Sequence, residues 1–182
     1  MVSIFSWARG VAAIGLLIAH PAFAQALAAD ADTWQPCPHA LAANDAPSPE
    51  KKWALTLAPY AHHWRFNPEH RPVFLGALER QVPGDRFCGL ALFRNSFGQP
   101  AAYAYVGQQW NHLMGHPELF VKLSAGFIYG YKGKYQNKIP FNEYGIAPVI
   151  IPSVGYALSK DDSLQVMVLG TAGLLFSYGR AF

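Results

Sequence analysis

The C-terminal stretch from Leu174 to Phe182, LLFSYGRAF, decides the fold that we expect for this chain. Successive side chains of a β-strand point to opposite faces. Here one face is large and mostly apolar and the other is mainly small or polar: Leu174, Phe176, Tyr178, Arg180 and Phe182 alternate with Leu175, Ser177, Gly179 and Ala181. This alternation is typical of a transmembrane strand, with lipid on one side and a barrel interior on the other.

The N-terminus predicts an exported protein. Arg9 precedes an apolar run at residues 11–18, which Pro21 and an A-x-A site at residues 22–24 follow. These features make a secretory signal peptide, residues 1–24, with a second cleavage site at residues 26–28. A membrane anchor is the alternative, but the apolar run is shorter than the roughly 20 residues that a spanning helix needs.

The composition of the chain excludes several classes of protein. Charged residues are 14% of the chain, against about 25% in ordinary soluble domains, and no long unbroken apolar run follows the signal peptide. An exported chain of this kind is either a soluble all-β domain or a β-barrel in lipid, where a closed barrel satisfies every backbone hydrogen bond. The net charge of +3 gives no indication of nucleic acid, and we expect none as a partner.

The mature chain divides into an irregular leader and a strand-rich domain. Residues 25–52, rich in Pro and Ala, form a periplasmic leader. Turn signals then separate eight strand-like runs within residues 53–182, which predict an all-β, eight-stranded antiparallel transmembrane barrel. The runs are residues 53–66, 72–81, 87–94, 100–110, 119–130, 144–158, 163–169 and 174–182.

An eight-stranded barrel has an interior that side chains or one small ligand can fill. On the first run we expect an apolar inward face, suited to an acyl chain, which His63 shares with Leu55, Leu57, Pro59 and Ala61. Pro148 and Pro152 interrupt the sixth run. Because proline removes a ladder hydrogen bond, this pair predicts a local opening of the barrel wall.

Topology places the candidate polar residues at one rim. Both termini of such a barrel lie on the periplasmic side, so the first, third, fifth and seventh turns face outside. His63 and Ser96 fall at this outer rim together with several basic residues, namely Arg65, His70, Arg71, Arg94, Lys132, Lys134 and Lys138. The basic residues either attract the phosphates of lipopolysaccharide or form a solvated rim.

The two cysteines of the chain lie close together in this topology. Cys88 begins the third run at the periplasmic end, near the leader that carries Cys37. The periplasmic route permits a disulfide, so the hypothesis is that they pair. Two unpaired thiols are the alternative.

In the order of its motifs the chain resembles a diverged member of the lipid A palmitoyltransferase (PagP-type) family of outer-membrane β-barrels. The resemblance covers about residues 53–182, and the paired prolines are its most specific part. The matching segments are His63-Trp64-Arg65-Phe66, Glu69-His70-Arg71-Pro72, Phe93-Arg94-Asn95-Ser96 and the stretch from Pro148 to Tyr156.

The resemblance implies an enzyme of the bacterial outer membrane that moves a palmitoyl chain from a phospholipid to lipid A without a cofactor. By position, His63, Asn95 and Ser96 match the catalytic residues of the family. We expect the rim cations Arg65, Arg71 and Arg94 to bind substrate, Pro148 and Pro152 to mark the entry of lipid, and Tyr105 to lie at the floor of the acyl pocket. The chain is expected to act as a monomer.

Three departures from the family pattern bear on activity. Asn95 stands where the family has Asp, and an amide cannot stabilise an imidazolium as a carboxylate does. Tyr105 is bulky where the family has a small residue, which shortens or closes the pocket. The leader also lacks the pattern of the amphipathic helix of the family.

Each candidate residue has a structural alternative. His62 and His63 can be interfacial residues beside Tyr60 and Trp64, while Asn95 and Ser96 can simply build a turn. If catalytic, His63 acts as general base or acid, and Asn95 or Ser96 polarises the ester or binds the oxyanion. No metal-ligand spacing occurs in the sequence. The alternative function is a non-catalytic small barrel that binds or passes a lipid or small amphiphile.

Overall fold

The structure is a computed structural model that describes residues 35–43 and 45–182. The predicted signal peptide and the first part of the leader, residues 25–34, lie outside the described residues. Residues 35–182 form one compact unit. Within the described residues, no helix is long and apolar enough to cross a membrane.

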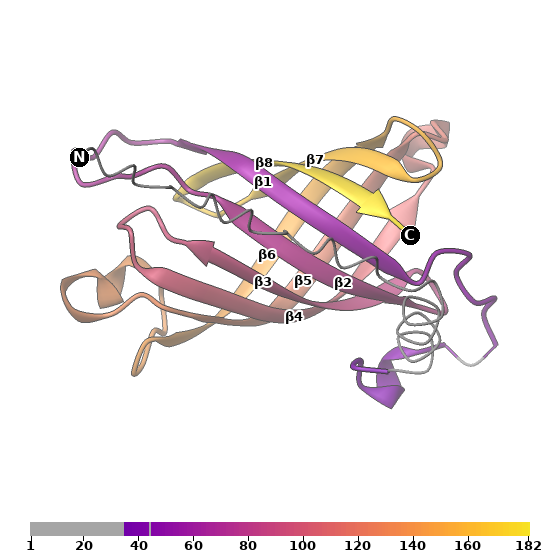
Figure 1. The fold of residues 1–182 in the computed structure, drawn as a ribbon, viewed down its shortest axis with the longest axis horizontal. Coiled ribbons are helices and arrows are strands. Elements are labelled where there is room, and N and C mark those ends of the chain that lie inside the picture. Colours follow the sequence, from indigo (N-terminus) through magenta and orange to yellow (C-terminus); the bar gives the residue numbers. More distant parts are fainter. Residues whose placement is uncertain (1–34, 44) are drawn as a thin grey trace, which may run out of the picture. The chain divides into compact units, whose positions relative to one another are not determined.

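Eight antiparallel strands close into a barrel, and each strand pairs with its neighbours in sequence (Figure 1). Because β1 pairs with β8, the sheet has no free edge strand. The prediction of an eight-stranded antiparallel barrel is confirmed. The strands are β1 (Trp53–His63), β2 (Leu75–Val82), β3 (Arg86–Arg94), β4 (Pro100–Asn111), β5 (Leu119–Tyr129), β6 (Ile146–Ala157), β7 (Asp162–Val168) and β8 (Gly173–Ala181).

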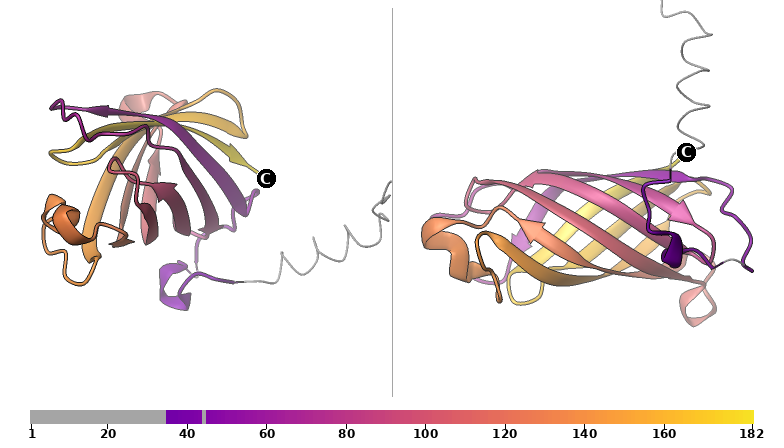
Figure 2. Two further views of the ribbon diagram at one scale, coloured as in Figure 1. Left: turned by 60° about the vertical axis from the view of Figure 1, so that its left-hand side comes forward. Right: turned by 90° about the horizontal axis from the view of Figure 1, so that it is seen from below.

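The strands run obliquely across the barrel and leave loops at two rims (Figure 2). The long-loop rim comprises residues 64–74, 95–99, 130–145 and 169–172, and it includes the 3-10 helix η3 (Gly133–Lys138). The terminus rim comprises the connections 83–85, 112–118 and 158–161, with η2 (Leu113–Gly115) in the second of them. Strand β1 begins at the terminus rim and β8 ends there.

The alternation predicted for the last strand is present in β8. Leu175, Ser177 and Gly179 are buried in the barrel, while Phe176 is 38% exposed on the outer face. The outer face of the other strands is similarly apolar and carries Leu78, Leu90, Leu92, Leu123, Phe127, Ile150, Val154 and Leu164 among its exposed side chains. An apolar surface of this extent indicates contact with lipid.

The inward face predicted for β1 was wrong over its first half. Leu55 and Leu57 are 42% and 37% exposed on the outside, whereas Thr56 and Ala58 are buried inside. The cause is a register shift between Leu57 and Tyr60 in the pairing of β1 with β8. Because side chains alternate with a period of two, one irregularity exchanges the two faces of the strand.

The barrel interior consists of an apolar half and a polar half. The apolar half lies toward the long-loop rim and contains the buried cluster Ala58, Val73, Leu75, Ala77, Ala91, Tyr103, Ile128, Ala147 and Leu175. The polar half lies toward the terminus rim and contains Thr56, Glu79, Lys122, Ser153 and Gln165. A polar cavity of about 340 Å³ occupies this second half.

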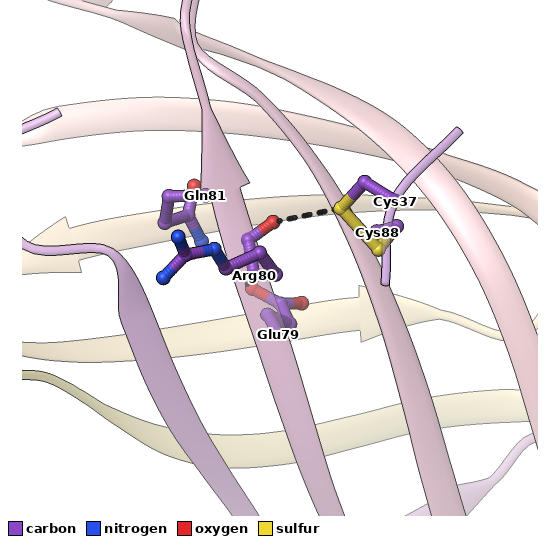
Figure 3. Close-up of a disulfide and its surroundings, with 5 residues drawn as sticks. All are labelled: Cys37, Glu79, Arg80, Gln81 and Cys88. Carbon is purple, nitrogen blue, oxygen red and sulfur yellow. Dashed lines mark hydrogen bonds between the residues drawn. A yellow bond between two sulfur atoms is a disulfide. The ribbon is translucent and has the colours of Figure 1, made fainter. Parts of the chain in front are cut away.

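The leader is attached to the outer face of the barrel by a disulfide between Cys37 and Cys88 (Figure 3). The Cα atoms are 5.4 Å apart, and the bond joins residues separated by 51 positions. The Cys37 Sγ lies 3.6 Å from the Arg80 carbonyl oxygen, a close contact rather than a hydrogen bond because a disulfide sulfur carries no proton. Leu41 and Val82 pack around the bridge.

The described part of the leader is irregular apart from the short 3-10 helix η1 (His39–Leu41). Arg86 Nη1 donates to the Leu41 carbonyl oxygen at 3.0 Å, and the Ala43 N–H donates to the Pro83 carbonyl oxygen at 3.2 Å. These bonds and the disulfide hold the leader against the β2–β3 hairpin.

Two seams interrupt the barrel wall near the long-loop rim. Strand β1 pairs with β2 only up to Ala58 and Leu75 in the described chain, so the last part of β1 has no strand neighbour on that side. Pairing of β6 with β7 begins only at Ser153, after both Pro148 and Pro152. The proline pair therefore coincides with a stretch of β6 that is bonded to β5 alone.

Candidate active site at the long-loop rim

His63 and Ser96 meet at the long-loop rim. His63 is the last residue of β1, and Ser96 lies in the β3–β4 turn. The His63 Nε2 atom is 2.7 Å from the Ser96 Oγ atom, within hydrogen-bond distance. An imidazole bonded to a hydroxyl is an arrangement in which a proton can pass between a base and a reacting group.

Asn95 lies beside Ser96 but its side chain is used inside the turn. The residue is only 1% exposed, and its Oδ1 accepts hydrogen bonds from the N–H groups of Phe97 and Gln99, both at 3.0 Å. Its Nδ2 lies 3.4 Å from the Gly130 carbonyl oxygen. The structure thus brings His63 and Ser96 together and engages both ends of the Asn95 carboxamide elsewhere.

His70 packs directly against His63. The two ring centroids are 4.0 Å apart with an interplanar angle of 33°. His70 also contacts Phe97: the two ring centroids are 5.4 Å apart in an edge-on arrangement. The sequence predicts His70 at the basic rim and within a matching segment but does not predict its contact with His63, because nothing in a single sequence indicates the path of residues 64–74.

A pocket of about 260 Å³ lies between the end of β1 and the segment that leads into β2. His63 and His70 lie on its wall with Arg71, whose backbone N–H donates to the Ser96 carbonyl oxygen at 2.8 Å. The remaining lining residues are Pro59, Tyr60, Ala61, Pro72 and Val73. Tyr60 is exposed on the outer face, so the lining of this pocket includes a residue of the outer surface at the β1–β2 seam.

No family model and no curated protein matches this sequence. One similar solved structure comes from the de novo design of transmembrane β-barrels: it is 14% identical, has a TM-score of 0.54, and the match covers 75% of this chain and 99% of that chain. The chain has the fold of a transmembrane β-barrel. A second solved structure, the N-terminal β-barrel domain of Pseudomonas aeruginosa OprF, is 12% identical with a TM-score of 0.43, and the match covers 72% of this chain and 97% of that chain. Identities this low show the fold alone.

Tyr105 separates the apolar half of the barrel from the polar half. Its ring stacks on Tyr103 with centroids 4.6 Å apart, and its hydroxyl donates to Glu79 Oε1 at 3.0 Å. Gly89 makes room for the ring, because a Cβ at that position would lie 2.6 Å from the Tyr105 Cζ atom. Tyr105, the bulky residue expected at the floor of an acyl pocket, is therefore bonded inside the barrel to a residue of β2, two strands away.

The predicted substrate-binding cations do not form one cluster. Arg71 lines the pocket, whereas Arg65 and Arg94 are exposed at the rim, where Arg94 Nη1 lies 3.4 Å from the Gly98 carbonyl oxygen. Pro148 and Pro152 lie on the exposed outer face of β6, at the second seam. No group of three or more potential metal ligands occurs among the described residues.

The β5–β6 loop contacts the β1–β2 loop and the β3–β4 turn at the long-loop rim. Glu69 accepts hydrogen bonds from Lys134 and from the Tyr135 hydroxyl, the latter at 3.1 Å. The Tyr135 ring stacks on Phe97 at 4.2 Å. Hydrogen bonds from Lys134 and then Tyr135 hold the pKa of the Glu69 carboxyl below its usual value.

This lowered pKa makes the loop contact sensitive to acid. Because the folded pKa of Glu69 is depressed, the contact is intact above the ordinary carboxyl range and is lost as pH falls through the folded pKa. In a nuclear magnetic resonance titration, we expect the Glu69 carboxyl carbon to titrate below about pH 4.3 and the amide signals of η3 to follow it.

A fixed-pH comparison tests the same contact. At neutral pH, Glu69→Gln is expected to speed amide hydrogen exchange in η3, whereas Glu143→Gln in the same loop leaves it unchanged. Titration of Glu69 at or above the ordinary Glu value, or equal exchange in both variants, would contradict the contact.

Proposed function

We propose that this barrel is an outer-membrane acyltransferase that moves a fatty acyl chain from a phospholipid to lipid A. The hydrogen bond between His63 and Ser96, beside a pocket at a seam of the wall, carries the proposal. The order of sequence motifs that resembles the palmitoyltransferase family supports it. No cofactor is required, because the reaction transfers an acyl group from one oxygen to another.

The geometry supports a proton transfer through His63. The imidazole takes the proton of the acceptor hydroxyl as this hydroxyl attacks the ester carbonyl of the phospholipid, and then returns it to the oxygen of the leaving lysophospholipid. Ser96 bonds to the Nε2 atom and aligns the ring for this transfer. Asn95 contributes by fixing the turn that presents Ser96.

The substrates reach the pocket from the bilayer. At about 260 Å³ the pocket is below the roughly 300–1,000 Å³ of sites that enclose a small molecule, so it accommodates the ester region while the rest of the lipid stays outside the wall. Arg71 lies on the pocket wall, where its guanidinium attracts a phosphate. In this proposal the long-loop rim faces the exterior, and the phospholipid, lipid A and the membrane are the only partners.

One observation favours a second candidate function. The Tyr103–Tyr105 stack and its bond to Glu79 occupy the middle of the barrel, where a long acyl chain would otherwise extend. A non-catalytic barrel that binds a lipid or small amphiphile at the β1–β2 seam fits this filled interior. The two candidate functions differ in whether lipid A gains an acyl chain in a reaction that depends on His63.

Lipid A mass spectrometry separates them. The wild type, His63→Ala and the control His62→Ala are expressed in a strain that lacks its own lipid A palmitoyltransferase. We expect an added acyl mass with the wild type and with His62→Ala, and none with His63→Ala. His62 is the matched control because it is the neighbouring residue and is exposed on the opposite face of β1. Spectra without added acyl mass for wild type and His63→Ala alike, with the folded barrel present, would overturn the acyltransferase proposal.

A further inference from the structure

We propose that His70 is a positioning residue of the candidate site, which holds the His63 ring in the orientation that meets Ser96. This inference rests on the proposed function, since it assigns a role in the same site to His70, a residue of a matching segment to which the resemblance gives no role. The rings of His63 and His70 pack against each other in a tilted arrangement, with centroids 4.0 Å apart.

His63 needs such support because its end of β1 is held on one side only. Its backbone pairs with Gly173 of β8, while the pairing of β1 with β2 stops at Ala58. Toward β2 the neighbour of His63 is the irregular segment that contains His70. The face of the imidazole that a strand would otherwise flank is thus covered by a second imidazole.

Asn95 does not supply this support. The resemblance places Asn95 where a carboxylate would assist the imidazole, but its Oδ1 accepts from the backbone of Phe97 and Gln99. In the described structure, the side chains in contact with the His63 ring include Ser96 at Nε2 and His70 against the ring face. Ser96 directs the Nε2 atom of His63, and His70 restricts rotation of the imidazole ring.

His70 is itself held firmly enough to act as a support. Its backbone N–H donates to the Asn67 carbonyl oxygen at 2.9 Å, and the next residue, Arg71, bonds to the Ser96 carbonyl oxygen at 2.8 Å. Its ring contacts Phe97 on the other side, and Phe97 stacks on Tyr135 of the β5–β6 loop. The loop that carries His70 is therefore tied to the same turn that carries Ser96.

Steady-state kinetics of acyl transfer in detergent micelles test the role. For His70→Ala we expect kcat to fall by about tenfold or more with KM within about twofold, because a catalytic group displaced by about 1 Å can lose on the order of 10²-fold in rate. His70→Phe keeps a ring against His63 and is expected to retain at least about half of the wild-type kcat. His116→Ala, at an exposed position of the terminus rim, serves as the control and stays at the wild-type rate.

The outcomes separate this inference from the proposed function. A kcat of His70→Ala equal to wild type, or a His70→Phe variant as slow as His70→Ala, overturns the positioning role. If the wild type transfers no acyl group, the proposed function fails, and the nitrogen-15 spectrum of the His63 ring still decides the positioning. We expect one fixed Nε2 environment in the wild type and an averaged signal in His70→Ala; identical His63 signals in both overturn the inference.

Discussion

Replacing Lys122 by methionine is expected to destabilise the folded barrel by about 3 to 5 kcal/mol. Lys122 and Glu79 form an ion pair inside the barrel, and their side chains are only 7% and 5% exposed. Methionine keeps most of the apolar stem but removes the ammonium group, which also lies 4.1 Å from the Phe87 ring centroid. The Glu79 carboxylate then stays buried without its counter-charge. The measurement is the free energy of unfolding in urea, in detergent micelles.

Two more variants separate the lost charge from lost packing. Lys160→Met, at an exposed position of the terminus rim, is expected to remain within about 0.5 kcal/mol of wild type. The double variant Glu79→Gln/Lys122→Met removes both charges and is expected to recover much of the loss, because no buried charge is left uncompensated. An unfolding midpoint of Lys122→Met equal to that of the wild type would contradict the buried ion pair.

Ser96→Ala is expected to lower the rate of acyl transfer by about 10²-fold, because a catalytic imidazole displaced by about 1 Å can lose on the order of 10²-fold in rate. The substitution removes the hydroxyl that lies 2.7 Å from His63 Nε2 and leaves the turn intact, since Asn95 builds it. The measurement is kcat/KM for transfer from a phospholipid donor in micelles.

The control for this variant is Ser177, a buried serine of the barrel interior. Ser177 lies in β8, and its hydroxyl is 3.4 Å from the Gln165 carbonyl oxygen. Ser177→Ala removes a comparable hydroxyl from the barrel interior, so it tests whether loss of a serine by itself slows transfer. A rate of Ser96→Ala that matches that of Ser177→Ala would show that the Ser96 hydroxyl takes no part in the reaction.

Strand positions were predictable because the alternation of side chains is a local property. The period of two in the last run, with Phe176 outward and Ser177 inward, is present in the structure. The same rule failed on the first run, where Leu55 and Leu57 face outward. The register shift near Pro59 adds a residue to one side of the ladder, and a count of alternate positions cannot detect it.

The proximity of His63 to Ser96 was also predictable, because the order of strands assigns both to one rim. Contacts that depend on the path of a loop, or that join strands across the barrel interior, could not be predicted from the sequence. His70 reaches His63 through the irregular segment before β2, and Glu79 and Lys122 pair across the interior from strands that are not neighbours. Neither contact leaves a periodic signal in the sequence.

We expect the outer face of these strands to contact lipid, and strand β5 offers the sharpest test of this contact. In lipid nanodiscs, relaxation by a nitroxide on the lipid acyl chain is compared with relaxation by a water-soluble gadolinium chelate. We predict that the nitroxide broadens the side-chain signals of Leu123 and Phe127, which face outward, and spares Ser124 and Ile128, which face inward. Broadening of Leu123 and Phe127 by the chelate, with no effect of the lipid nitroxide, would contradict a membrane-spanning barrel.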